Sequence, residues 1–191
     1  MTAAQEQDVV DLLLEQHDEI RSLFSQLENA QGGARQELFD ELVRLLAVHE
    51  SAEEEVVHPT ARRKLEDGEQ VVESRLREED EAKHALAELY DLGVDHPEFN
   101  SKLAALAQAV TQHAMREESE EFLRLRQTVE PDQLRRMAGA LKAAEATAPT
   151  RPHPRTGESA AANLIAGPPL AMFDRMRDAV RGWSKSNRTD D

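Results

Sequence analysis

Residues 41–57, ELVRLLAVHESAEEEVV, carry the clearest helical pattern in the chain. Around this stretch, apolar side chains recur every three or four residues, and that spacing places them on one face of an α-helix. The face comprises Leu38, Leu42, Leu45, Leu46, His49, Glu53, Val56 and Val57. A histidine and a glutamate, four residues apart, therefore share a face that is otherwise apolar. Because proline lacks an N–H group, we expect Pro59 to kink or end this helix.

Other stretches show the same spacing, and short breaks rich in glycine, proline or acidic residues separate them. The first expected helix covers roughly residues 7–30, and the breaks fall at residues 32–33, 66–68 and 95–97. Short connections between long helices favour antiparallel neighbours. The chain is therefore expected to be all-α, with three parts: an antiparallel up-down-up-down four-helix bundle over residues 1–130, an additional helix over 131–148, and an extended linker with a short amphipathic tail segment over 149–191.

The composition limits the functions open to this chain. Its 191 residues include 38 acidic and 23 basic ones, which gives a formal net charge of −15. That charge repels phosphates and suits cations, so we expect no nucleic-acid partner. The absence of cysteine excludes disulfides, thiolate metal sites and iron–sulfur clusters. Residues 1–8 lack the features of a secretory signal and no apolar run is long enough to span a bilayer, so we expect a cytoplasmic protein without a transmembrane segment.

Four histidines are expected to lie at one height in the bundle. Two residues of an antiparallel helix pair lie at the same height when they are equidistant from the turn. Residue 33 is midway between His17 and His49, the midpoint of His49 and His84 falls between residues 66 and 67, and that of His84 and His113 falls between 98 and 99. Each midpoint lies within about two residues of a break, or about 3 Å along a helix.

The same reasoning predicts a layer of carboxylates next to the histidines. Glu53, Asp80 and Glu117 each lie four residues from a histidine of the first layer, so each shares its face about 6 Å away, one helical turn along. The three histidines that fail the height test are expected to have solvated or local roles: His58, His96 and His153.

Burying four imidazoles and three carboxylates without a compensating cation costs several kcal/mol per ion, as an order of magnitude. Metal coordination removes that cost, because metals bind neutral imidazole and carboxylate. We therefore favour a metal site over a polar core network. Seven donors exceed the usual four of one zinc ion, and mixed imidazole and carboxylate ligands suit iron or manganese. Two ions bridged by Glu53 and Glu117 would use this number of donors.

The order of these motifs resembles the hemerythrin-type (HHE cation-binding) domain over about residues 8–130. The matching residues are His17 on the first helix, HESAEEEVVHP (49–59) with His49 and Glu53 on the second, His84 on the third, and HAMREE (113–118) with His113 and Glu117 on the fourth. The stretches PTRPHP (149–154) and NLIAGPPLAMFDRMRDAV (163–180) are similar to the C-terminal extension of some bacterial members.

The resemblance implies a four-helix bundle with two non-haem iron ions joined by an oxo or hydroxo group; manganese or a mixed-metal pair stays an alternative. By position it implies that Glu53 and Glu117 bridge the ions. Glu118 competes for that role, because oxygen-carrying hemerythrins place their acid five residues after the histidine. Additional ligands, or residues that support ligands, are expected among Asp80, Glu50, Glu118 and Glu81; Glu50 is similar to a carboxylate of iron-sensing hemerythrin domains.

Oxygen-carrying hemerythrins have HxxxH on the third helix, where this chain has Asp80 and His84. An anionic ligand is expected to stabilise ferric iron, which favours reaction or sensing over reversible oxygen carriage. Two functions stay open: a protein that binds iron and O₂, NO or peroxide in sensing, storage or detoxification, and a peroxide-consuming (catalase-like) or oxidase enzyme. The C-terminal segment carries an apolar stripe that consists of Leu170, Phe173, Met176, Val180 and Trp183. We expect this stripe to pack on its own bundle or to form a homo-oligomer, and binding to an acidic membrane or a partner is the alternative.

Overall fold

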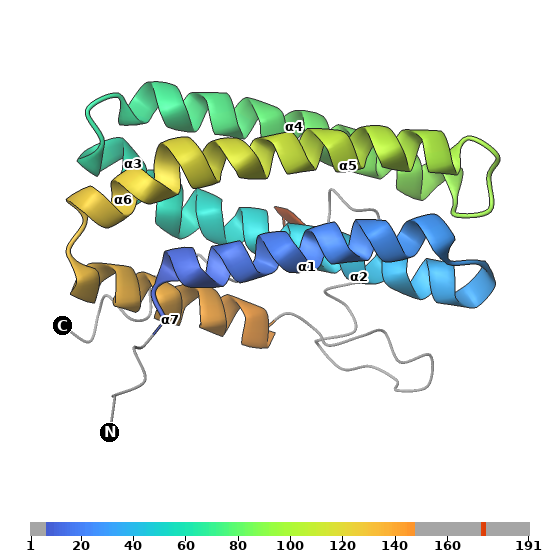
Figure 1. Cartoon of the computed structure of the whole chain (residues 1–191), viewed down its shortest axis with the longest axis horizontal. Helices are drawn as coiled ribbons and strands as arrows, with labels where there is room; N and C mark the ends of the chain where they lie inside the picture. Colours follow the sequence, from blue (N-terminus) through green and yellow to red (C-terminus); the bar gives the residue numbers. More distant parts are fainter. Residues whose placement is uncertain (1–6, 148–172, 175–191) are drawn as a thin grey trace.

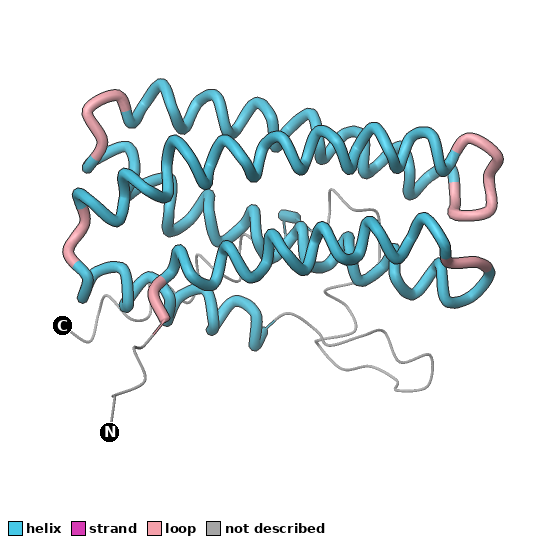
Figure 2. Tube along the Cα trace, viewed as in Figure 1, coloured by secondary structure: helices cyan, strands magenta, loops and turns pink. Residues whose placement is uncertain are grey.

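The computed structural model describes residues 7–147 and 173–174, and this part of the chain is helical with short connections (Figures 1 and 2). The elements in chain order are α1 (Val9–Asn29), α2 (Gly32–Ala52), the π-helical η1 (Glu53–Val57), α3 (His58–Lys64), α4 (Gly68–Leu92), α5 (Phe99–Arg116), the π-helical η2 (Glu117–Phe122), α6 (Leu123–Thr128) and α7 (Pro131–Thr147).

Four helical rods run antiparallel to one another in Figure 1. The first rod is α1, the second is α2 with η1 and α3, the third is α4, and the fourth is α5 with η2 and α6. The helix α7 lies along the first two rods, against α1, α2 and η1. The prediction of an all-α, antiparallel four-helix bundle with an extra C-terminal helix is thus confirmed.

The ends of the rods follow local chemistry. Asp8 caps α1: its side chain accepts a hydrogen bond from the backbone N–H of Asp11, and the Asp11 side chain accepts one from the backbone N–H of Asp8. At the far end of α4, Gly93 adopts a φ of 82°, a left-handed conformation that a residue with a side chain rarely takes. These caps set where each rod stops, and with it the heights at which side chains on neighbouring rods meet.

The expected break in the second helix near Pro59 is present: α2 ends at Ala52, and α3 begins at His58 after the π turn η1. The rod stays helical to Lys64, and Pro59 stands in the first turn of α3, directly after η1. In η1 the backbone N–H of His58 donates to the carbonyl oxygen of Glu53, five residues earlier. The wider π turn resets the hydrogen-bond register before the proline, so its missing N–H falls at the start of a new α-helix, where it costs little.

Two apolar clusters fill the bundle, and a polar belt separates them. One cluster joins residues from Ile20–Leu27, Phe39–Val48 and Leu86–Val110. The other joins residues from Val9–Leu13, Ala52–Leu65 and Phe122–Leu141. On every rod, buried polar residues lie between the two clusters, so the polar side chains share the middle height of the bundle.

Phe173 belongs to the first apolar cluster and is 2% exposed. Its ring lies 5.3 Å from the Nζ atom of Lys83 on α4. The rest of the expected linker and amphipathic segment lies outside the described residues. Among the helices that the structure describes, none combines the length and apolar character that crossing a membrane requires.

Candidate metal centre

Six buried side chains of the polar belt form two overlapping groups. The first, here called the histidine-rich group, consists of His17, His49, Glu53 and Glu117. The second, the carboxylate-rich group, consists of Glu53, Glu79, His113 and Glu117. Within each group, one donor atom per residue lies within 4.8 Å of the others, which is compact enough to surround one metal ion. Both groups use Glu53 and Glu117.

The Nε2 atoms of three histidines lie close to one another or to the two shared carboxylates. The Nε2 atoms of His17 and His49 are 3.1 Å apart. Glu117 reaches both sides of the belt: its Oε2 lies 3.3 Å from Nε2 of His17, and its Oε1 lies 3.1 Å from Nε2 of His113. On the second rod, Oε2 of Glu53 lies 3.4 Å from Nε2 of His49. The three imidazoles therefore converge on the two shared carboxylates.

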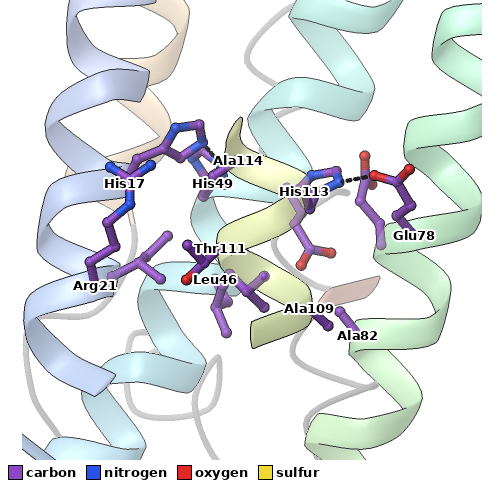
Figure 3. Close-up of a pocket in the computed structure, with 14 residues that line it drawn as sticks. His17, Arg21, Leu46, His49, Glu78, Ala82, Ala109, Thr111, His113 and Ala114 are labelled. Atoms are coloured by element: carbon purple, nitrogen blue, oxygen red, sulfur yellow. Dashed lines mark hydrogen bonds and ion pairs between the residues drawn. The ribbon is translucent and has the colours of Figure 1, made fainter. Parts of the chain in front are cut away.

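The Nδ1 atoms of these histidines point away from the centre and are held by other residues. His49 donates to Oε1 of Gln16 at 2.8 Å, and His17 donates to Oε1 of Glu118 at 2.9 Å. His113 donates to Oε2 of Glu78 at 2.9 Å (Figure 3). When such a ring is neutral, donation through Nδ1 leaves its lone pair on Nε2, which is the state that binds a metal.

The donor set fits a cation. Both oxygens of Glu53 and of Glu117, one oxygen of Glu79 and Nε2 of His113 are buried and make no hydrogen bond. Buried polar atoms are normally hydrogen-bonded, because leaving a charged one unpaired costs several kcal/mol. Here the unpaired atoms converge on one place, and positive charge between them would satisfy them all.

Ionisation of the metal-free belt follows from burial and neighbouring charge. Burial, together with the nearby Glu117 charge, raises the pKa of Glu53 well above its ordinary value. Against the opposing effect of burial, the His113 charge holds the pKa of Glu117 well below its ordinary value, and Glu117 in turn raises the pKa of His113 to about 11. Burial lowers the pKa of His49, so its ring is neutral. Without metal, the centre therefore retains protons.

His58 is buried, so the expected solvated or local role is wrong. Its Nε2 donates to Oε1 of Glu79 at 2.8 Å and its Nδ1 to Oε1 of Glu121 at 3.4 Å. Although burial opposes it, the hydrogen bond to Glu121 leads the effects that raise the pKa of His58 well above its ordinary value. His58 therefore supports the carboxylate-rich group as an imidazolium.

Two π turns explain why apolar spacing does not predict that His58 and Glu121 point inward. At about 100° per residue, His58 would face the side opposite to His49 in an unbroken α-helix, nine residues on. The extra residue of η1 turns His58 back toward the interior, and η2 does the same for Glu121. The feature of the sequence that could have indicated this change of face is the EEEVVHP run (53–59), in which acidic residues precede a proline.

The structure does not bring His84 and Asp80 to the centre, which corrects the expectation for the third helix. Their side chains are 65% and 71% exposed, and Nδ1 of His84 donates to the backbone oxygen of Asp80 at 2.7 Å. The buried face of α4 is instead Val72, Arg75, Glu79, Lys83, Leu86 and Leu89. This face is inward because its charged members are paired: Arg75 with Glu78 and Glu120, Glu79 with His58, and Lys83 with Glu50 and Glu54.

The other residues that were expected to bind metal or to support its ligands lie in different environments. Glu50 is buried, with Oε2 3.2 Å from Nζ of Lys83, and burial raises its pKa to about 8. Glu118 lies on the outer side of His17, where Nη2 of Arg21 donates to its Oε1 at 2.6 Å, so Glu117 rather than Glu118 faces both histidine sides. Glu81 is exposed and outside both groups.

A pocket opens beside the centre, between α1, α2, α4 and α5 (Figure 3). His17, His49 and His113 lie on its wall with Glu79. Its other walls are mainly small or apolar, with a few polar side chains: Ile20, Arg21, Leu46, Glu50, Glu78, Ala82, Ala109, Val110, Thr111 and Ala114. The pocket therefore borders the histidines beside the first apolar cluster, some of whose residues line it.

Comparison with known proteins gives consistent results. A family model described as "Hemerythrin HHE cation binding domain" matches residues 8–125. In the crystal structure of a hemerythrin HHE cation binding domain-containing protein from Mycobacterium kansasii, the fold is similar with a TM-score of 0.66 and 17% identity. The match covers 88% of this chain and 99% of that one. At this identity it shows the fold.

Two curated relatives differ in length. An uncharacterized hemerythrin-like protein of Schizosaccharomyces pombe is 23% identical over 92% of this chain and 87% of its own length. A protein named DNA nickase from Nostoc sp. is 28% identical over 142 residues, which are 74% of this chain but 40% of the relative. The chain thus spans well under half of that relative.

Proposed function

This chain belongs to the hemerythrin HHE cation-binding family, and from that premise we propose that it binds two iron ions and reacts with a small ligand such as O₂, peroxide or NO. The observation that carries the proposal is the pair of four-residue groups that share Glu53 and Glu117. A carboxylate shared by two groups can bridge two ions through its two oxygens. Mixed imidazole and carboxylate donors suit iron, with manganese as the alternative metal.

In this proposal the ligand roles divide between the groups. His17 and His49 would bind one ion, and His113 with Glu79 would bind the other. Glu118, Gln16 and Glu78 hold the outer nitrogens, so the three rings face the ions through Nε2. Glu79 takes the place expected for Asp80 as the carboxylate ligand from the third helix. An anionic ligand from this helix would therefore still stabilise ferric iron. Two bound iron ions would supply electrons to, or accept them from, the small ligand.

The pocket determines what can approach. Its apolar walls, Leu46, Ala82 and Ala109 among them, favour small uncharged molecules over hydrated ions. Arg21 lines the pocket while it is tied to Glu118. A ligand that enters here meets His17, His49 and His113, so the chain itself orients the approach and limits water at the reacting side.

Glu50 favours the second candidate, a peroxide-consuming or oxidase enzyme. Its carboxyl group lies on the pocket wall, its Oε2 is 3.2 Å from Nζ of Lys83, and burial raises its pKa to about 8. Such a group can hold a proton next to a reacting ligand, which catalysis needs and simple binding does not. Glu50→Gln should then lower peroxide turnover while the bound metal stays at two ions per chain.

Anaerobic titration of the metal-free protein with Fe(II) tests the proposal. We expect saturation at about two ions per chain, in keeping with the two groups. The loaded protein is then exposed to O₂, H₂O₂ or NO, with zinc-loaded protein as the redox-silent control. A stable, reversible absorption band supports binding, whereas O₂ release from peroxide supports catalysis. Saturation at one ion, or no retained metal, would contradict the proposed centre.

A further inference from the structure

The helix α7 contacts the candidate centre through one hydrogen-bonded chain of side chains. Glu145 on α7 accepts a hydrogen bond from Nε2 of Gln16 at 2.6 Å, and Oε1 of Gln16 accepts one from Nδ1 of His49 at 2.8 Å. Glu145 lies outside residues 8–125, the range that the family model matches. A residue beyond the four-helix bundle is thus two hydrogen bonds from a candidate metal-binding ring.

Gln16 differs from the residues that hold the other two rings. Glu118 and Glu78 are carboxylates, which only accept when ionised, so each alone obliges its histidine to donate from Nδ1. The amide of Gln16 has both a donor and an acceptor end, and either could face His49. If the NH₂ end faced Nδ1, His49 would carry its proton on Nε2, where it would block metal binding.

Glu145 removes this ambiguity. Its carboxylate attracts the NH₂ end of Gln16, which turns the carbonyl end toward His49. Gln16 and His49 are 4% and 3% exposed, so water has little access to replace either partner. The one ring held by an amide is therefore the one that requires a third residue.

We propose that Glu145 is a positioning residue for the metal centre: it fixes the Gln16 amide so that His49 keeps its proton on Nδ1 and presents Nε2 to an ion. The second part of this proposal, that Nε2 of His49 faces an ion, rests on the proposed function. The first part, the position of the proton on His49, does not depend on metal. The helix α7 thereby contributes to the centre as well as to the apolar core.

The test uses the full-length chain with Glu145→Ala, Glu145→Gln and, as a control on the same helix, Asp132→Asn, whose side chain is exposed and pairs with Arg135. Nitrogen-15 NMR of the histidine rings in metal-free protein reports the proton position directly. We expect wild type and Asp132→Asn to keep His49 protonated on Nδ1, and Glu145→Gln, whose amide can present either end to Gln16, to lose part of that preference. Glu145→Ala should shift His49 toward Nε2 protonation.

Iron titration of the same variants gives the second readout. Glu145→Ala should weaken binding of one ion about tenfold, the lower range for loss of a residue that supports a metal ligand. Glu145→Gln should fall between wild type and Glu145→Ala. If Glu145→Ala leaves both the His49 proton and the affinity as in wild type, or if Asp132→Asn changes them as much as Glu145→Ala does, the positioning role is overturned. A shifted proton in a chain whose wild type binds no metal would support the positioning of His49 and refute the proposed function instead.

Discussion

The histidine-rich group and the carboxylate-rich group share two residues and differ in the other two. His17 and His49 complete the first group with two imidazoles, whereas Glu79 and His113 complete the second with one imidazole and one further carboxylate. Their surroundings differ as well: the Gln16–Glu145 chain adjoins the first, and the paired charges of His58 and Lys83 adjoin the second, while the pocket touches members of both. Two ions held here would therefore be unlike, because the second has one more carboxylate and would be more strongly stabilised in a higher charge state.

Removal of a shared residue should have the largest effect, because it damages both groups. Glu117→Ala leaves His17 and His113 without their common carboxylate. We expect bound iron to fall from about two ions per chain to nearly none after desalting, measured by elemental analysis, with a loss of affinity above about a hundredfold. Circular dichroism shows whether the variant is folded. Firm retention of one ion would show that the groups are independent.

Variants of unshared residues should separate the groups. His49→Ala removes a donor from the histidine-rich group alone, and Glu79→Ala removes one from the carboxylate-rich group alone. We expect each variant to keep about one ion per chain. The two variants should differ in their absorption after O₂ exposure, because the ion left in Glu79→Ala has two imidazole donors and the ion left in His49→Ala has one. Metal analysis and absorption spectra after O₂ exposure measure both effects. Equal loss of both ions in each variant would contradict the division.

The pH dependence should have opposite signs with and without metal. The pKa of His113 rises from an ordinary 6.5 to about 11, and that of Glu50 from 4.5 to about 8, so the metal-free folded chain binds more protons than the unfolded chain between those values. Its stability should fall as pH rises from 6.5 to 8. Iron must displace protons from His113 and Glu53. The affinity for iron should therefore rise as the pH rises, by about tenfold per pH unit for each proton released. The melting temperatures of loaded and metal-free protein should diverge over this range; a constant gap would count against proton displacement.

His58→Ala should weaken the carboxylate-rich group specifically. The change removes the donor that holds Glu79, with the buried carboxylates of Glu79 and Glu121 left unpaired. We expect about a tenfold loss of affinity for one ion, and a lower melting temperature. Titration calorimetry with Fe(II) under anaerobic conditions measures it. An equal loss at the other ion would show that His58 acts through the whole bundle.

The smallest effect is expected for the pair that the sequence placed at the centre. Asp80→Ala with His84→Ala alters exposed side chains of α4. Stability should change by less than about 0.5 kcal/mol, and iron stoichiometry should not change. The double variant is therefore the matched control for Glu79→Ala on the same helix. Loss of an ion here would restore the original assignment and refute the observed face of α4.

The sequence was sufficient to predict the bundle. It was also sufficient to locate the helices whose buried faces carry no charged residues other than those of the recognised motifs. Apolar spacing and breaks located α1, α5 and α7 to within a few residues, and spacing from the turns placed His17 beside His49. For the third helix the height was right and the face was wrong. Glu79 is as well centred as Asp80, since residue 66 is midway between it and Glu53, and only the face separates the two.

Two physical effects hid the rest of the site. Charged residues such as Arg75, Glu79 and Lys83 are normally expected to face solvent. Here, ion pairs across the bundle offset the cost of their burial. Following the apolar stripe backwards from Leu89 and Leu86 would have led to them. The π turns are the second effect, because they change the face of His58 and Glu121 without any change in apolar spacing.

Diffraction from crystals of the iron-loaded protein, recorded at the iron absorption edge, would locate the ions themselves. We expect two anomalous peaks about 3.5–4 Å apart, the usual spacing of two-metal sites, with Glu53 and Glu117 between them. His17 and His49 should lie at one peak, and Glu79 and His113 at the other. A single peak, or peaks at the exposed His84 and Asp80, would contradict a pair of ions held by two groups that share their carboxylates.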